Sequence, residues 1–283
     1  MEHAHPDNFK LTVLVENSTR SAALIGEHGF SIHIETGHGS GLFDTGQTGA
    51  PIENAVTLGI DLARLDWIVL SHGHYDHCGG LPAVLDNAPN ARVVSHPDAF
   101  LRKYVVCEGG GHRDAGMPIT KAELEARGVA MRLDTRPVRV APKIWTTGEV
   151  ARTNAFETIP ERFAIDRGNG AFEPDPFADD MSLVLETSEG LVVLLGCSHA
   201  GVVNIVNHIG QWWPGQSIHA LIGGMHLHEA DSDRIDRTVR IVKGRGINVV
   251  GPGHCTGETA VERFRETFGR RCVTCSTGQT FLF

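Results

Sequence analysis

The stretch "SHGHYDHCGG" (residues 71–80) places three histidines and an aspartate within six positions, directly after the apolar run "DWIVLS" (66–71). The apolar run is typical of a buried strand, whose end delivers the polar residues into one short loop. Alternate side chains of an extended segment point the same way, so His72 and His74 can reach one metal ion. The sequence therefore predicts a metal site at the end of this strand.

The same motif offers a second set of donors in Asp76 and His77. If the chain turns into a helix after the first two histidines, these two side chains face a neighbouring position. Gly79 and Gly80 permit the sharp turn. Imidazole and carboxylate suit zinc, and also iron or manganese, and two such ions can share one activated water. We expect two divalent ions, zinc by default.

Polar donors also follow three later apolar runs of the chain. Cys197 and His199 follow "LVVLLG", His226 follows "IHALIGGM", and His254 follows "INVVGPG". The carboxyl ends of strands are where α/β folds place ligand sites, because the loops there converge on one rim. We expect these side chains to converge on the first motif, with His226 as a candidate proton donor to a leaving group.

The pattern along the chain predicts an α/β fold, with short β-rich runs separated by helical patterns. Residues 97–180 are less regular, and we interpret them as a cap or insertion within a single domain of residues 1–283. The expected strands are 10–17, 30–36, 41–46, 66–71, a hairpin over 181–197, 218–224 and 247–251. The expected helices are 50–60, one from about 202, 233–244 and 257–268, with a further helix at "TKAELEARG" in the cap.

Composition excludes several classes of partner. The formal charge of −9 is spread along the chain and shows no basic face for nucleic acid or anionic lipid. No apolar run approaches the roughly 18 residues of a membrane span, and the start lacks the pattern of a signal peptide. The six cysteines do not form a disulfide framework, so we expect a reducing cytoplasm. The histidines of "MEHAHP" (1–6) are expected in a frayed terminus.

At this point the chain resembles a known family. "SHGHYDH" is similar to the HxHxDH signature of the metallo-β-lactamase superfamily, and "GLFDTG" resembles its segment that braces the metal loop, here through Asp44. Together with "GCSHAGVVNIV", "GGMHL" and "PGHCTG", the motif resembles the branch named for dihydropterin ribofuranosylaminobenzene phosphate synthase. The resemblance implies a four-layer αββα sandwich with a cap insertion and a metal centre at one edge, between the two sheets.

The resemblance also implies a ligand set. His72 and His74 would bind the first metal, and Asp76, His77 and His254 would bind the second. Asp76 would in addition orient the attacking water.

Two further ligand positions depart from the pattern of the family. The position that matches the usual histidine before the central hairpin is Pro176, which cannot bind a metal, and His199 is our replacement candidate. Cys197 occupies the place of a metal-bridging aspartate. Its thiolate could bind zinc, or it could be a small buried residue with Asp180 nearby. His96, at another strand end, is interpreted as a helix-entry residue rather than a ligand.

The predicted function is a metal-dependent hydrolase that uses a metal-bound hydroxide on an ester, lactone or phosphoester. Two alternatives stay open: a transferase acting on a phosphorylated pterin-type substrate, and a non-catalytic metal-binding sensor. The substrate is expected to be a small molecule, and an anionic one if the cations of the cap bind it. Those cations are Arg102, Lys103, Arg113, Arg152, Arg162 and Arg167. Cys272 and Cys275 lack a second pair of donors beside them, so we expect no zinc there.

Overall fold

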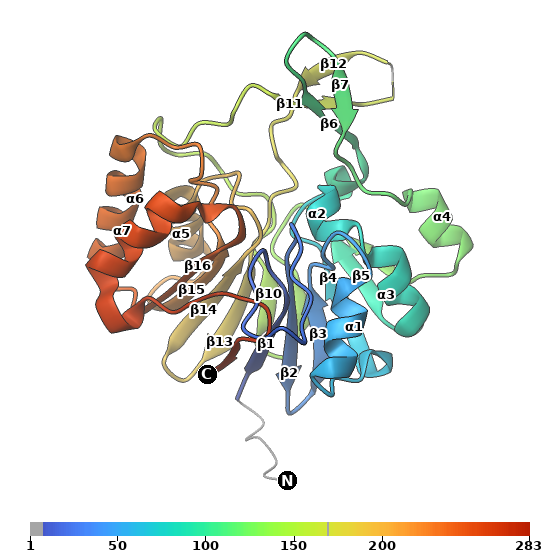
Figure 1. The fold of residues 1–283 in the computed structure, drawn as a ribbon, viewed down its shortest axis with the longest axis horizontal. Coiled ribbons are helices and arrows are strands. Elements are labelled where there is room, and N and C mark those ends of the chain that lie inside the picture. The colour runs from blue at the N-terminus through green and yellow to red at the C-terminus, as the bar shows by residue number, and fades with distance from the viewer. Residues whose placement is uncertain (1–7, 169) are drawn as a thin grey trace.

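The computed structural model describes residues 8–168 and 170–283, so the expected frayed terminus at residues 1–6 lies outside the described residues. Two β-sheets pack face to face, and helices cover the outer face of each sheet (Figure 1). This αββα arrangement confirms the predicted fold class. No helix in the described ranges is long and apolar enough to cross a membrane.

The first sheet combines antiparallel strands at one edge with parallel strands at the other. Its helices contribute apolar side chains to a core on its outer face. In spatial order the strands are β17 (Thr280–Leu282), β1 (Lys10–Val15), β2 (Ser31–Thr36), β3 (Gly39–Phe43), β4 (Leu65–Val69), β5 (Arg92–Ser95) and β8 (Met131–Leu133). The helices on this side are α1 (Ala50–Thr57), α2 (Tyr75–Cys78), α3 (Leu81–Asn87) and α4 (Lys121–Ala126).

The second sheet is built around the predicted hairpin, which continues into parallel strands. In spatial order its strands are β16 (Val249–Gly253), β15 (Ile218–Gly224), β14 (Gly190–Leu195), β13 (Leu183–Thr187), β10 (Ile144–Thr146) and β9 (Arg139–Ala141). Its outer helices are α5 (Val202–Trp212), α6 (Ser232–Gly244) and α7 (Glu258–Phe268).

Strand β14 shows why an uninterrupted apolar run forms a strand here. Val192 and Leu194 belong to the core between the two sheets, whereas Val193 and Leu195 belong to the core under the helices. Successive side chains of a strand point to opposite faces, and both faces of this one are covered. Polar residues therefore begin only where the strand ends, at the rim of the sandwich.

Residues 97–180 do not all lie outside the two sheets. Strand β8 belongs to the first sheet, and β9 and β10 belong to the second, so the expected insertion is interrupted by core strands. A small third sheet lies over the rim of the sandwich in Figure 1. In spatial order it contains β12 (Phe172–Pro174), β11 (Phe163–Asp166), β6 (Arg102–Val106) and β7 (His112–Asp114). The division into one domain with a cap stays a prediction.

Candidate metal centre

The loops that follow β4, β14, β15 and β16 meet at one edge between the two sheets. They bring together all the side chains predicted as metal ligands, and every one is buried, with at most 8% of its surface exposed. These residues are His72, His74, Asp76, His77, Cys197, His199 and His254. The expected convergence of strand ends is therefore confirmed, while the binding of metal by these residues stays a prediction.

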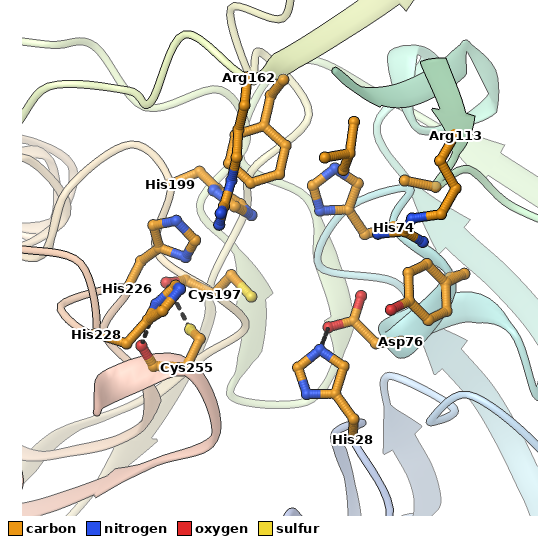
Figure 2. A pocket seen from close by; sticks show the side chains of 14 residues that line it. His28, His74, Asp76, Arg113, Arg162, Cys197, His199, His226, His228 and Cys255 are labelled. Carbon is orange, nitrogen blue, oxygen red and sulfur yellow. Dashed lines mark hydrogen bonds and ion pairs between the residues drawn. The ribbon is translucent and has the colours of Figure 1, made fainter. Parts of the chain in front are cut away.

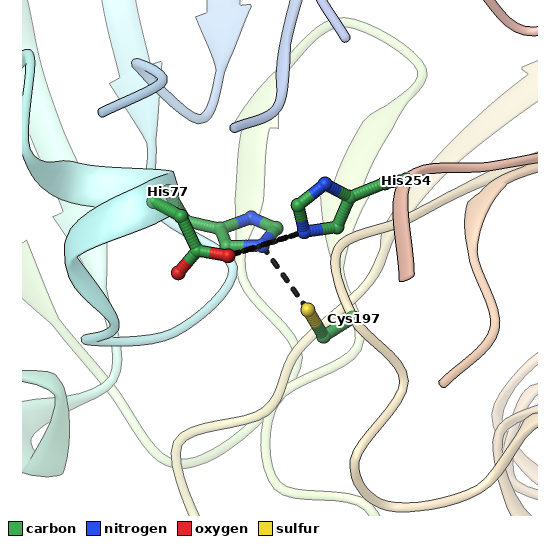
Figure 3. A group of neighbouring side chains, drawn as sticks. His77, Cys197 and His254 are labelled. Atoms are coloured by element: carbon green, nitrogen blue, oxygen red, sulfur yellow. Dashed lines mark hydrogen bonds and ion pairs between the residues drawn. The ribbon is translucent and has the colours of Figure 1, made fainter. Parts of the chain in front are cut away.

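One donor cluster contains Asp76, His77, Cys197 and His254, whose donor atoms all lie within 4.8 Å of one another (Figure 3). His77 Nε2 lies 3.1 Å from His254 Nε2 and 3.1 Å from Cys197 Sγ. His254 Nε2 lies 3.2 Å from Asp76 Oδ2. Neighbouring donors around a tetrahedral ion with bonds of about 2.0–2.1 Å are roughly 3.3 Å apart. The spacing therefore fits one cation bound by these side chains.

A second donor cluster contains His72, His199 and Cys197, which it shares with the first cluster. His74 lies beside it: His72 Nε2 is 3.2 Å from His74 Nδ1, and the ring of His199 lies 5.0 Å from that of His72 and 5.1 Å from that of His74. Both ring nitrogens of His199 are buried and have no hydrogen-bond partner among the described residues. A buried polar group left unpaired is costly, so this ring fits a metal ligand better than a structural residue.

Two neighbouring residues, one of them next to Pro176 in the sequence, hold His199 in place. The adjacent residue, Phe177, stacks on the His199 ring with the centroids 3.8 Å apart and the planes 16° apart. Arg152 donates a hydrogen bond of 2.8 Å from Nη2 to the carbonyl oxygen of His199. An aromatic ring thus lies against the histidine on one side, and a guanidinium holds its backbone.

His77 and His254 are each oriented by a second residue. Asp44 Oδ2 lies 2.6 Å from His77 Nδ1, and both side chains are completely buried. His254 Nδ1 lies 3.0 Å from Asn17 Oδ1, and its backbone N–H donates a hydrogen bond of 2.6 Å to Glu16. Such partners fix the tautomer of a ligating histidine, because the nitrogen away from the partner keeps its lone pair. This geometry agrees with the expectation, drawn from the family resemblance, that Asp44 braces the metal loop.

Burial and neighbouring charges give the histidines of the site different pKa values. Burial lowers the pKa of His72, His74 and His199, and that of His74 falls to about 3, so these rings are neutral and keep a lone pair for a cation. Burial also acts to lower the pKa of His77, but the charges of Asp44 and Asp76 and the hydrogen bond to Asp44 together outweigh it and raise the pKa to about 9.

Local backbone strain is concentrated at this site. Six described non-glycine residues have φ between 44° and 61°, in the left-handed region that L-residues rarely adopt, and five of the six surround the donors. They are Asp44, Phe177, Ser198, His226 and His254. Such strain persists where surrounding structure fixes it, and it is typical of functional sites.

Four of the donors, His74, Asp76, Cys197 and His199, line a cavity of about 190 Å³ (Figure 2). His226 also lines it, and both of its buried ring nitrogens have no hydrogen-bond partner among the described residues. The third sheet and the residues next to its strands complete the lining with Val105, Arg113, Ala115, Arg162 and Phe163.

The Arg and Lys side chains of residues 97–180 lie in different environments. Arg113 and Arg162 both line the cavity in Figure 2. Lys103 is only 1% exposed and lies away from solvent between two aspartates, and Arg152 supports the loop of His199. Two of these cations are therefore placed to meet a ligand in the cavity.

The sequence did not point to Cys255 or His28 as site residues. Cys255 lines the cavity, and its sulfur belongs to a further close group of donors with Cys197 and His226. The only sequence signal was its place directly after a predicted ligand in "PGHCTG". His28 Nε2 lies 3.4 Å from Asp76 Oδ2, and no strand-end pattern marks it.

The remaining candidates lie outside the close donor groups. His96 caps a short helix, with Nδ1 accepting a hydrogen bond of 3.1 Å from the backbone two residues later, which confirms the helix-entry interpretation. Asp180 accepts a hydrogen bond of 2.8 Å from the Ala200 amide, and burial raises its pKa to about 7. In the described part of the chain, the close donor groups include neither His96 nor Asp180, and they include neither Cys272 nor Cys275.

We expect chelator-treated protein to bind zinc more tightly as the pH rises from about 6.5 toward 9. His77 must lose a proton to bind, and its pKa is raised from 6.5 to about 9. The raised pKa has the opposite effect on the metal-free fold, whose extra stability is full below pH 6.5 and is lost as the pH rises through 9. Competition with a chromophoric chelator at several pH values would measure the affinity.

The matched variant for this experiment is Asp44→Asn. Without the carboxylate, the pKa of His77 falls, so the rise in affinity should end at a lower pH than in the wild type. Identical pH profiles for the two proteins would show that Asp44 does not control the protonation of His77.

Comparisons with known proteins agree with this geometry. Residues 24–157 match a family model described as the metallo-β-lactamase superfamily. The chain is 31% identical over 272 residues to the 7,8-dihydropterin-6-methyl-4-(β-D-ribofuranosyl)-aminobenzene-5'-phosphate synthase of Methanocaldococcus jannaschii, which covers 93% of this chain and 92% of that protein.

Solved structures give the same picture of the fold. The crystal structure of a metal-dependent hydrolase of the β-lactamase superfamily superimposes with a TM-score of 0.83 at 31% identity, covering 96% of this chain and 98% of that one. A metallo-β-lactamase fold protein from Bacillus subtilis reaches a TM-score of 0.60 at 14% identity, with 98% of this chain and 100% of that chain covered, and shares the fold alone.

Proposed function

Since this chain belongs to the metallo-β-lactamase superfamily, a family of enzymes, we propose that it is a metal-dependent hydrolase of an ester, lactone or phosphoester. The observation that carries the proposal is the pair of donor clusters on the cavity wall. Within each cluster the donor atoms lie within 4.8 Å of one another, as ligands of one cation would, and the buried nitrogens of His199 have no hydrogen-bond partner among the described residues.

Two divalent cations, zinc by default, are proposed for this centre. His72, His74 and His199 would hold the first cation. Asp76, His77 and His254 would hold the second. When bound, such cations supply Lewis acidity, which acidifies water and polarises a carbonyl or phosphoryl oxygen. The donor sets suit zinc, iron and manganese alike.

Cys197 is proposed as a shared ligand. Its sulfur is close to donors of both clusters. Burial raises the pKa of the thiol, so it would become a thiolate only beside a cation.

The chain supplies the remaining groups for hydrolysis from the cavity wall. Asp76 faces the cavity, and its carboxylate is proposed to orient the attacking water as well as to hold a cation. His226 faces the same space, and neither ring nitrogen has a hydrogen-bond partner among the described residues, so one of them is proposed to donate a proton to the leaving group. Phe163 and Val105 add apolar surface to the cavity lining, and Phe163 lies next to the rings of His74 and His199.

The proposed substrate is a small anionic molecule. Arg113 and Arg162 both line the cavity, and guanidinium groups suit carboxylate or phosphate. We treat the third sheet as the cap that contributes to substrate choice. The described cysteines are all free, which supports the proposal of a reducing cytoplasm.

A second candidate function is a transferase that acts on a phosphorylated pterin-type substrate. It is favoured by the 31% identity to the synthase of Methanocaldococcus jannaschii over 93% of this chain. Both candidates use the same donor clusters and the same cationic residues of the cavity. They differ in whether water or a second substrate accepts the transferred group.

Metal analysis followed by a substrate panel tests the proposal. Protein purified without chelator should contain about two divalent ions per chain, because the donors exceed what one tetrahedral ion needs. Turnover of esters, lactones and phosphoesters in ¹⁸O-labelled water should place the label in the product. Less than about half an equivalent of metal would contradict the metal centre. Product without label, formed only with a second substrate, would favour the transferase, and metal without any turnover would favour a sensor.

A further inference from the structure

Lys103, in β6 of the third sheet, carries a charge that is enclosed by protein. The residue is 1% exposed, and its ammonium lies 2.8 Å from Asp175 Oδ2 and 3.0 Å from Asp179 Oδ1. A buried group of ion pairs adds little to the free energy of unfolding. We therefore ask which neighbouring residues this group holds in position. Here each carboxylate has a second oxygen that binds another part of the site.

The first carboxylate holds the loop of the motif. Asp179 Oδ2 accepts a hydrogen bond of 2.8 Å from the backbone N–H of Gly73, the residue between His72 and His74. The loop has little room to move, since a Cβ on Gly73 would lie 2.1 Å from the carbonyl oxygen of Ala99. A hydrogen bond to a charged acceptor is stronger than one between neutral groups. Asp179 therefore fixes the backbone that carries two of the first-metal histidines.

The second carboxylate holds the support of the third histidine. Asp175 Oδ1 accepts a hydrogen bond of 2.7 Å from the backbone N–H of Phe177. The Phe177 ring is the one that stacks on His199, and Lys103 Nζ lies 5.3 Å from the centre of that ring. One ammonium thus links two carboxylates. One binds the backbone between His72 and His74, and the other binds the backbone of the residue whose ring stacks on His199.

We propose that Lys103 is a positioning residue for the first metal position, acting through Asp179 on the loop of His72 and His74 and through Asp175 and Phe177 on His199. The inference rests on the proposed function, because that function assigns the three histidines to a cation. Lys103 also belongs to the strand that supplies Val105 to the cavity lining, so the same side chain connects the third sheet with the proposed metal ligands.

The test compares Lys103→Met with wild-type protein in a chelator competition that resolves the two cations. Affinity at the first position should fall by about 10-fold or more, the cost typical of residues that orient ligands, while the second position keeps its affinity. The loss should not exceed that of His199→Ala, which removes a ligand, and the double variant should lose less than the two single losses combined. The control is Lys121→Met, because Lys121 is an exposed lysine of α4. Unchanged affinity at the first position in folded Lys103→Met would overturn the proposal.

A second variant covers the case in which Lys103→Met does not fold. Asp175→Asn keeps an acceptor for the Phe177 amide and leaves Lys103 paired with Asp179, so the fold should persist. Affinity at the first position should fall several-fold, and hydrogen exchange of the Phe177 amide should accelerate. If neither changes, the proposal is wrong.

Hydrogen exchange also separates this proposal from the proposed function. The amides of Gly73 and Phe177 should exchange faster in Lys103→Met even in chelator-treated protein. A wild-type chain that binds no cation would overturn the proposed function, whereas unchanged exchange at both amides would overturn the role of Lys103.

Discussion

The Asp76→Ala variant should lose at least about 100-fold in turnover and about one of two bound cations. Asp76 Oδ2 lies 3.2 Å from His254 Nε2 and 3.7 Å from His77 Nε2, so its removal takes away the charged member of that cluster. Removing a residue that only orients a ligand costs about 10–100-fold in metal affinity or activity, so removal of a ligand should exceed that range. Initial rates and elemental analysis of the purified variant measure both effects.

The fold of Asp76→Ala should persist, because the side chain lies at the edge of the sandwich rather than in a hydrophobic core. His77→Ala should show the same loss of turnover and of one cation. A matched control is Asp86→Ala, since the side chain of Asp86 is 72% exposed on α3. If Asp76→Ala kept full turnover and full metal content, the assignment of this cluster would be wrong.

The His199→Ala variant should weaken the first cation by about 10-fold or more. The variant removes a buried ring that lies 5.0 Å from His72 and has no other partner for its nitrogens among the described residues. A binding titration of chelator-treated protein would resolve the two affinities. Turnover should fall with the occupancy of the first position, so added zinc should partly restore it.

His96→Ala is the matched control for this prediction. His96 is also a buried histidine at a strand end, but its Nδ1 accepts a backbone hydrogen bond of the helix that it caps. The metal content of His96→Ala should equal that of the wild type. If His199→Ala and His96→Ala bound metal with equal affinity, His199 would not be the third ligand of the first cation, and the assignment would be wrong.

Much of the fold was predictable because both faces of its central strands are covered. Continuous apolar runs such as that of β14 therefore marked the strands, and their ends marked the rim. Strands β8, β9 and β10 have three residues each, which is too short for an alternation of polar and apolar residues to distinguish them from a loop. For that reason the sequence did not show that part of 97–180 belongs to the core sheets.

The site was predictable where its donors are contiguous. His72, His74, Asp76 and His77 share one short motif, and strand ends placed the later donors near them. The role of Lys103 was not predictable, since its partners are 72 and 76 residues away and nothing local distinguishes it from a solvated cation. The left-handed φ of 51° at His254 was equally hidden, because it is imposed by surrounding structure rather than by the residue type.

Pairing of β17 with β1 has a consequence for synthesis of the protein. Lys10 pairs with Leu282 and Thr12 with Thr280, so the first sheet acquires its edge strand from the far end of the chain. A ribosome-bound chain therefore exposes the unpaired edge of β1 until residues 280–282 have emerged, and an open strand edge is a template for aggregation. Ribosome-stalled or truncated chains that end before β17 should depend on chaperones more strongly than the full-length protein.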